Sequence, residues 1–431
     1  MIMHPRLKSS MNAPLLRLQR MLRTDVVYAA KGGFWLSLGS AIGTLSSLII
    51  VVAFANLAPK ETYGSYKYLL AIAGTLAGFT LSGLGEALAG AAARGRDGTL
   101  RVLVRRAFQW NLLIAGAAFA GASWYFWHGS AMLGWALLAV GAFLPVTQST
   151  GLYAAFLRGR KLFRTSAAYN VVRTVIPAAA MIAALTFFQE HPAALVAAFM
   201  GSSALTSHAA YRSVLRGRTR NDDVEPSALR FGAHVSLLNA LGSAAANLDK
   251  IVIFQAVGAA PTAVYALAQA FPEQIDAVVS NVRTLALPQF AGQTVRSGFA
   301  PMLRKTAIIF FAMIPLAGVA MLVTPLAFRS LFPAYMDAVP YALVLMAAQI
   351  PIGAAHLPFA FITAHHDIRG RAAAGVITPV VWIVSLLLLV RPYGLMGAAV
   401  AKLIAKSCGL ILTIIASALL SRRVPTPPAS S

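Results

Sequence analysis

Twelve apolar stretches, each about twenty residues or longer, constrain the fold of this chain more than any other feature. A helix of about twenty residues crosses the roughly 30 Å hydrocarbon core of a bilayer. Of the 431 residues, 58% are hydrophobic and 11% are charged, too few charges for a soluble protein of this length. The sequence therefore predicts an all-α polytopic membrane protein with about 12 transmembrane helices. The predicted spans are 33–57, 65–92, 107–127, 132–157, 166–188, 192–211, 231–256, 261–290, 304–326, 337–362, 372–390 and 395–420.

The basic residues are distributed unevenly between the two sides that these spans define. Of the 36 Lys and Arg residues, 27 lie on one side of the membrane, four on the other and five within spans. Because cytoplasmic loops carry the excess of Lys and Arg, both termini are predicted to be cytoplasmic. This placement accounts for the net charge of +23 without nucleic-acid binding, which needs basic residues grouped on a soluble face. Residues 1–31 form a basic cytoplasmic segment and 421–431 a cytoplasmic tail.

The longest cytoplasmic connection, residues 212–230, divides the chain into two halves of six spans each. Its run of charged residues is typical of a solvated linker. An offset of 199 residues aligns the first helices of the two halves. It places the polar residues Ser37, Ser40 and Thr44 over Ser236, Asn239 and Ser243. We therefore expect two similar six-helix lobes, residues 32–211 and 231–420, inserted in the same orientation.

Polar residues recur at helical spacing inside two spans of the second half. The first stripe comprises Ser236, Asn239, Ser243, Asn247 and Lys250. The second comprises Gln269, Glu273, Asp276, Ser280 and Arg283. A charge near the bilayer centre costs roughly 2.5–3.5 kcal/mol or more, so neither stripe should face lipid. The stripes indicate a wet cavity lined by Asn239, Ser243, Asn247, Gln269 and Ser280. The alternative for the first stripe is that it only holds helices together.

Three segments carry a resemblance to a known family. They are ANLAPKETYGSYKYLLAIAG (55–74), NLDKIVIFQAVG (247–258) and the overlapping QAVGAAPTAVYALAQAFPE (255–273). The chain resembles the bacterial Wzx-type polysaccharide or O-antigen flippases of the multidrug/oligosaccharidyl-lipid/polysaccharide exporter superfamily. The resemblance implies two lobes around a central cationic cavity. It also implies transfer of a polyprenyl-diphosphate-linked oligosaccharide across the bacterial inner membrane, for biosynthesis of lipopolysaccharide O-antigen, capsule or exopolysaccharide. The expected partners are this lipid-linked saccharide, membrane lipid, a polysaccharide polymerase and a chain-length regulator.

A flippase for a diphosphate lipid needs cations in a low-dielectric cavity, where attraction to phosphate is weakly screened. Arg grips phosphate with two donors and Lys acts as a point charge. The predicted substrate-binding residues are Arg173, Lys250, Arg283 and Lys406. The alternatives are that Arg173 extends to the cytoplasmic headgroups, and that Arg283 pairs with Asp276 or Glu86.

Glu273 and Asp276 lie one helical turn apart at mid-membrane. Two neighbouring carboxylates cannot both ionise cheaply, so this pair could share a proton and act as an ion-coupling site. The alternative is that the two carboxylates neutralise Lys250 or Arg283.

Two other functions compete with flipping. One is a cation-coupled exporter of drugs or metabolites. The other is an integral-membrane polysaccharide polymerase or glycosyltransferase, although the longest outer loop, about 327–336, is short for such an enzyme. The P-loop pattern GxxxxGK[ST] does not occur, and a single cysteine argues against a cysteine-based metal cluster. We therefore expect no enzyme, no catalytic residue, no cofactor and no metal site.

The charge asymmetry predicts on which side of the membrane two positions of the chain lie. Reporter domains fused after Arg220 and after Ser431 should both report the cytoplasm, because the flanking loops carry the basic excess. The measurement uses two reporters at each position, one active only in the cytoplasm and the other active only on the outer side. An outer-face signal at either fusion would contradict the predicted topology.

Overall fold

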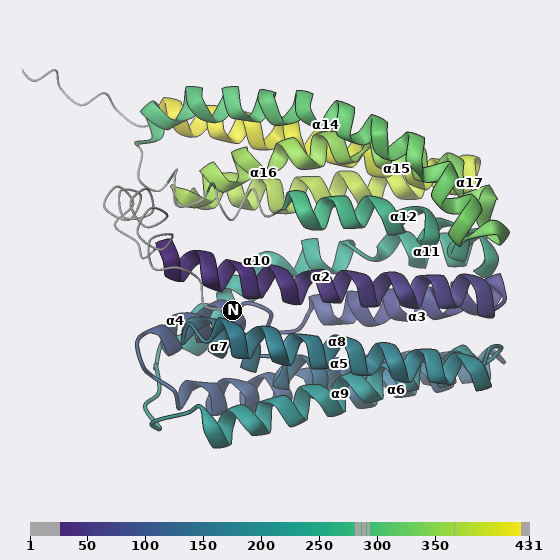
Figure 1. Ribbon diagram of the computed structural model, residues 1–431, viewed down its shortest axis with the longest axis horizontal. Coiled ribbons are helices and arrows are strands. Elements are labelled where there is room, and N and C mark those ends of the chain that lie inside the picture. The colour runs from purple at the N-terminus through teal and green to yellow at the C-terminus, as the bar shows by residue number, and fades with distance from the viewer. Residues whose placement is uncertain (1–25, 281–285, 287–289, 291–293, 366, 424–431) are drawn as a thin grey trace, which may run out of the picture.

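The computed structural model describes residues 26–280, 286, 290, 294–365 and 367–423. The regular elements in this part of the chain are helices, as the apolar spans predict, and they lie roughly side by side (Figure 1). Each predicted span has a helical counterpart, which confirms the predicted all-α polytopic architecture. The helices form two lobes, with the N-terminal helices in the lower part of the view and the C-terminal helices in the upper part.

The described residues of the first half, 26–217, contain eight helices that account for six predicted spans. They are α2 (Val26–Leu57), α3 (Lys60–Gly78), α4 (Leu84–Ala93), α5 (Thr99–Trp127), α6 (Ala131–Thr150), α7 (Tyr153–Gly159), α8 (Phe163–Phe187) and α9 (Pro192–Gly217). Two spans are broken: residues 79–83 separate α3 from α4, and residues 151–152 separate α6 from α7.

The second half repeats this pattern with broken helices of its own. Its elements are α10 (Ala228–Ala245), α11 (Leu248–Ala256), α12 (Ala259–Val279), α14 (Val295–Leu331), η1 (Pro333–Ala338), α15 (Val339–Ala347), α16 (Gln349–Ala364) and α17 (Ile368–Arg423). Ala246 and Asn247 interrupt the first predicted span of this half. Gly258, with φ 110°, makes the turn between α11 and α12 in a conformation that favours glycine.

The long helix α17 is a hairpin that supplies the last two predicted spans. The backbone reverses at Gly394, whose φ of 55° lies in the left-handed region. The two arms then pack together, because Ser385 Oγ lies 3.5 Å from the carbonyl oxygen of Ala401. A Cβ on Gly409 would stand 3.1 Å from Thr378, which shows close arm-to-arm contact.

Six helices among the described residues are long and apolar enough to cross a membrane. They are Ala131–Gly159, Phe163–Phe187, Pro192–Gly217, Val295–Leu331, Pro333–Ala364 and Gly370–Arg422. The last is the α17 hairpin, which provides two crossings. A pair bent by 48°, Ala228–Leu237 with Asn239–Ala256, adds a further span. The remaining predicted spans coincide with α2, α3–α4, α5 and α12, whose helices are too short, too polar or too charged to be counted with these six.

The two lobes meet where α3 and α4 pack against the C-terminal helices. A Cβ on Gly64 would stand 1.8 Å from the carbonyl oxygen of Ala259 at the start of α12. A Cβ on Gly78 would stand 2.6 Å from the backbone nitrogen of Ala244 in α10. Small residues allow such close backbone approach in membrane bundles. The backbones of the two lobes therefore touch directly at these positions.

One end of this interface is also closed by polar contacts. Lys60 Nζ and Asp337 Oδ2 form an ion pair at 3.0 Å, and Asn56 Nδ2 donates to the carbonyl oxygen of Leu331 at 3.1 Å. The rings of Tyr63 and Tyr335 meet edge to face at 6.4 Å. These residues lie in or beside loops predicted to face outward, so the lobes are joined at that end.

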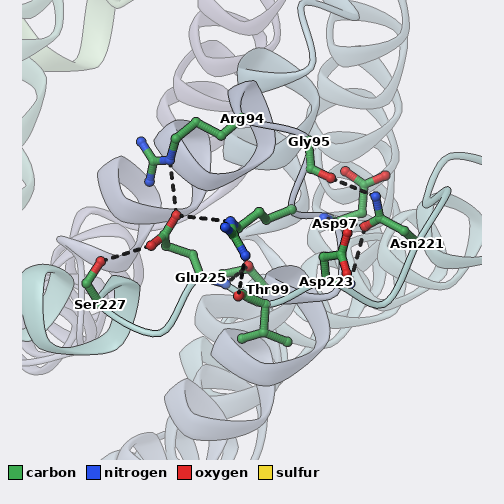
Figure 2. A network of polar contacts seen from close by, with 10 residues as sticks. Arg94, Gly95, Asp97, Thr99, Asn221, Asp223, Glu225 and Ser227 are labelled. Atoms are coloured by element: carbon green, nitrogen blue, oxygen red, sulfur yellow. Dashed lines mark hydrogen bonds and ion pairs between the residues drawn. The ribbon is translucent and has the colours of Figure 1, made fainter.

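At the opposite end, the segment between the lobes is folded onto the N-terminal lobe rather than solvated along its length. We call residues 220–227, with the α4–α5 loop on which they lie, the linker clasp. Asp97 in that loop is fully buried and accepts bonds from Arg160 Nη2 at 2.7 Å and the Arg220 backbone N–H at 2.8 Å. Asn221 bonds the loop twice, accepting from the Asp97 N–H at 3.0 Å and donating to the Gly95 carbonyl at 2.8 Å (Figure 2).

Glu225 binds the C-terminal end of the linker segment to the α4–α5 loop (Figure 2). Its carboxylate accepts from Arg94 Nε at 3.0 Å and lies 3.5 Å from Arg96 Nε. Its backbone N–H donates to Thr99 Oγ1 at 2.9 Å. The hydrogen bond from Arg94 is the main reason that the pKa of the Glu225 carboxyl is held below its usual value.

The lowered pKa of Glu225 predicts a pH-dependent clasp. A depressed pKa means that ionised Glu225 favours the docked state above its ordinary pKa, and that this contribution is lost as pH falls through the lowered pKa. Acidification should therefore reduce hydrogen-exchange protection of the amides of residues 218–227. Glu225→Gln should lower that protection at neutral pH and remove most of its acid dependence.

Asp223→Asn is the matched control for this experiment. Asp223 lies in the same segment and is exposed, and its carboxylate has no ion-pair partner among the described residues. Its exchange profile should match the unmodified protein. Unchanged protection in Glu225→Gln would show that the carboxylate does not hold the clasp.

Candidate functional site

The C-terminal lobe contains a buried polar cluster around Asp249, in the first turn of α11. Asn247 occupies the N-cap position, and a carboxylate in the first turn interacts favourably with the helix dipole. The Asp249 side chain is fully buried, and its Oδ1 accepts the backbone N–H of Lys250 at 2.9 Å. A buried carboxylate is costly unless it is paired and hydrogen-bonded, so the neighbours of Asp249 determine whether the fold tolerates it.

Three side chains from three helices surround Asp249. Lys250 Nζ lies 3.7 Å from Oδ1, and Lys402 Nζ in α17 lies 3.7 Å from Oδ2. Gln269 in α12 links the group, since its Nε2 donates to Asp249 Oδ2 at 2.6 Å and its Oε1 accepts from Lys250 Nζ at 2.7 Å. The cluster therefore joins α11, α12 and α17 in one network of compensated charge.

The two carboxylates predicted to couple ions lie beside this network, and each has its own partner. Glu273 Oε1 is 4.0 Å from Lys250 Nζ, with 58% of its side chain exposed. Asp276 Oδ1 is 3.2 Å from His356 Nε2 in α16, with 43% of its side chain exposed. The structure thus gives Asp276 a titratable partner other than Glu273. Both groups remain open to solvent, as a titrating site requires.

A cavity of about 270 Å³ opens beside the cluster. Its charged lining residues are Glu273, Asp276, Lys402 and Lys406. Lys406 Nζ has no ion-pair partner within 4 Å among the described residues. Gln349 also lines the cavity, and its Oε1 is buried with no hydrogen-bond partner. Two lysines and two carboxylates thus line the cavity, and this balance of positive and negative charge suits the exchange of a small ion or a proton.

Arg173 lies elsewhere, in the N-terminal lobe. It lines a cavity of about 440 Å³ bounded by α2, α3, α6, α8 and α9. The predicted substrate-binding residues are therefore divided between two lobes, with Lys250 and Lys406 in the C-terminal lobe. Arg283 lies outside the described residues. Lys250 is engaged by Asp249 and Gln269, so it has less capacity to bind phosphate than the sequence suggests.

The first polar stripe is split by the break between α10 and α11 and contacts the N-terminal lobe. Ser236 Oγ accepts the Gly83 N–H at 2.9 Å, and a Cβ on Gly74 would stand 2.6 Å from the Asn247 amide. Ser243 lies beside Gly78 of α3, and Asn239 is one turn earlier on α10. The alternative that this stripe holds helices together fits Ser236 and Asn247. Ser280 follows the last residue of α12, and its Oγ donates to the Ala277 carbonyl of that helix at 2.9 Å.

Sequence reasoning missed several members of the cluster. Asp249 and Lys402 are not among the site residues that the sequence predicts. His356 and Gln349 stand singly in apolar stretches, a signal that could have identified them. Within the described residues, no group of three or more His, Cys, Asp or Glu side chains is arranged to hold a metal ion.

The fold of this chain is found in solved structures of membrane transporters. It is similar to an inward-facing multidrug resistance MATE family transporter of the MOP superfamily, with TM-score 0.66 and 16% identity, covering 90% of this chain and 98% of that one. It is similar to the lipid II flippase MurJ in an inward closed conformation, with TM-score 0.66 and 13% identity, covering 90% and 88%. A MOP superfamily transporter from Pyrococcus furiosus gives TM-score 0.55 and 12% identity, covering 92% and 95%.

A family model described as polysaccharide biosynthesis protein matches residues 29–291. The chain belongs to this family, and it has the fold of the MOP-superfamily membrane transporters. This confirms the family resemblance that the sequence carries. No protein of curated function matches the sequence.

The Asp249 network predicts a specific pattern of stability. Asp249→Asn should destabilise the protein by about 3–5 kcal/mol, because it leaves Lys250 and Lys402 without their common counter-charge. Adding Lys402→Met should restore part of the loss by removing one unpaired cation. The measurement is thermal unfolding of the purified protein in detergent for each single variant and the pair, read as a double-mutant cycle.

Lys406→Met serves as the control, since Lys406 lies one turn from Lys402 but has no ion pair with Asp249. It should not rescue Asp249→Asn. If the changes in stability caused by Asp249→Asn and Lys402→Met simply add in the double variant, the two side chains do not interact and the network is wrong.

Proposed function

We propose that this protein is a flippase that moves a polyprenyl-diphosphate-linked oligosaccharide across the bacterial inner membrane for O-antigen, capsule or exopolysaccharide assembly. The observation that carries the proposal is membership of the polysaccharide biosynthesis family in a chain with a MOP-transporter fold. The similarity in fold to MurJ, which flips lipid II, supports a lipid-linked saccharide as substrate. Both termini are cytoplasmic in this proposal, and a polymerase with its chain-length regulator uses the transported product.

Glu273 and Asp276 are the ion-coupling residues of this proposal. Both line the C-terminal cavity and are partly exposed, so protons or small cations can reach them. Lys250 and His356 stand beside them and respond electrostatically to any change in their charge. Binding and release of a cation there would alter the contact of α12 with α16, where Asp276 meets His356.

A multidrug exporter with the same fold is the competing function, favoured by the similarity to MATE transporters. Carboxylates in a binding cavity favour cationic ligands. The described residues that line the N-terminal cavity include Arg173 and no carboxylate, which favours an anionic substrate over a cationic one.

Transport of a defined substrate tests the proposal. The purified protein in liposomes should move a fluorescent polyprenyl-diphosphate-linked saccharide between leaflets, and the gene should restore surface polysaccharide in a host that lacks its own flippase. Export of a cationic dye without movement of the lipid-linked saccharide would support the exporter instead.

The coupling residues can be tested in the same liposomes. Glu273→Gln with Asp276→Asn should abolish most of the dependence of transport on an imposed proton or sodium gradient, because neither amide changes charge. Glu190→Gln, which alters an exposed carboxylate outside the cavity, should leave that dependence intact. A double variant with unchanged gradient dependence would exclude these two residues from coupling.

A further inference from the structure

We propose that the first turns of α10 form a binding site for an anionic phospholipid of the cytoplasmic leaflet. Arg230 and His234 bind its phosphate, and Phe231 and Leu237 contact its acyl chains. This ligand is a lipid of the surrounding bilayer and not the transported substrate, so the inference does not rest on the proposed function.

A surface groove of about 570 Å³ lies along the beginning of α10, where the chain leaves the linker clasp. Its described lining residues are Ser227, Arg230, Phe231, Ala233, His234 and Leu237. Leu237 is 75% exposed and Phe231 is 54% exposed, so other described residues leave most of their apolar surface uncovered. Lipid tails are as apolar as these side chains and are their natural neighbours at the start of a membrane-spanning helix.

The groove faces the bilayer rather than the space between the lobes. Ser236 lies on the face of α10 that packs on α4, because its Oγ accepts the Gly83 N–H at 2.9 Å. Arg230 and His234 are four residues apart and share another face. With 3.6 residues per turn, Ser236 and Asn239 of the polar stripe lie roughly 140–160° around the helix from His234. The groove is therefore on the side of α10 opposite the polar stripe.

The charged groups in the lining of the groove are suited to binding an anion. Arg230 is exposed and forms no ion pair with another described residue. His234 is exposed one turn later and can donate a ring N–H in either protonation state. Glu225 approaches the rim, where its Oε1 accepts from Ser227 Oγ at 3.2 Å, but its Oε2 is already bound by Arg94 Nε at 3.0 Å. A phosphate beside Arg230 would therefore meet donors and not an uncompensated carboxylate.

The order of these residues along α10 matches the order of groups in a phospholipid. Arg230 lies at the boundary of the predicted span, with His234 about 6 Å deeper and Leu237 about 10 Å deeper at 1.5 Å per residue. A phosphate held at the boundary thus places the acyl chains beside Leu237. Under the predicted topology this boundary is cytoplasmic, where the negative surface potential of the membrane attracts basic residues next to a span.

Residues 1–25 of the same chain suit the groove less well. They carry five Lys and Arg residues and one acidic residue, Asp25, so their net positive charge opposes docking beside Arg230. An anionic lipid has the complementary charge. When bound, it would attach the first turns of α10 to the inner leaflet, next to the point where the linker clasp ends.

Photolabelling of the full-length protein in lipid nanodiscs tests this site. The probe is phosphatidylglycerol with a diazirine on one acyl chain, and phosphatidylethanolamine with the same chains is the zwitterionic comparison. Labelling of the α10 peptide that contains Leu237 and Leu241 should be about fivefold stronger with phosphatidylglycerol, as expected for one basic side chain at an anionic lipid surface. Arg230→Gln with His234→Gln should remove this preference, whereas Arg230→Lys should keep most of it because the charge remains.

Two controls accompany this measurement. Arg216→Gln alters an exposed arginine near the same end of the bundle that does not line the groove, and it should leave the labelling of α10 unchanged. Labelling of α14, whose exposed Leu322 lies outside the groove, normalises each measurement and shows that each variant is inserted.

Three results would overturn the site. Equal labelling of α10 by the two headgroups in the unmodified protein would show a general apolar contact. Absence of label on α10 would show that another occupant, such as residues 1–25, covers the groove. Excess undecaprenyl diphosphate should leave the labelling unchanged, and displacement of phosphatidylglycerol by it would assign the groove to the substrate path instead. A failure of the proposed function would alter none of the expected results.

Discussion

The C-terminal lobe depends on the ion pairs and hydrogen bonds of the buried Asp249 carboxylate. Removing a charge from water is so costly that Asp249 can be accommodated only beside cations and donors held within a few ångströms. Lys250 from the same helix, Gln269 from the next helix and Lys402 from α17, which is far away in sequence, satisfy it. The same network fixes the rotation of α12, and that rotation decides that Glu273 and Asp276 face the cavity. A single desolvated charge thus positions the groups that are proposed to bind the coupling ion.

The contacts between the lobes differ at the two ends of the bundle, which bears on how the protein changes conformation. At the end predicted to face outward, Gly64 meets the backbone of Ala259, and Lys60 pairs with Asp337 across the interface. Opening that end would separate these contacts. At the other end, the linker clasp binds the connecting segment to the N-terminal lobe through Asp97 and Glu225. The part of the connection that is not held by the N-terminal lobe is therefore shorter than the sequence suggests, and α10 begins beside the last of these contacts.

The sequence predicts the helices well, because bilayer thickness fixes the length of an apolar span. It also predicts that Gln269, Glu273 and Asp276 share one face, since helical spacing alone determines this. It could not predict that Lys402 reaches Asp249, because that contact joins residues 153 positions apart through tertiary packing. Periodicity failed at the α10–α11 break, where the stripe no longer follows one helix and Asn247 contacts α3 instead. The charged linker resembles solvated chain in composition, and its docking depends on a buried aspartate in a distant loop.

The unequal distribution of charge between the lobes suggests how substrate binding could be linked to conformational change. The C-terminal cluster is compensated internally, so its electrostatic free energy changes little when the lobes move, unless Glu273 or Asp276 binds a cation. Arg158 and Arg173 line two N-terminal cavities, of about 440 and 310 Å³, and neither forms an ion pair with another described residue. Closing them away from water costs free energy, because desolvated charges of like sign repel strongly. An anionic ligand bound between the two guanidinium groups would lower that cost. Closing of the lobes would then be easier for the loaded protein than for the empty one.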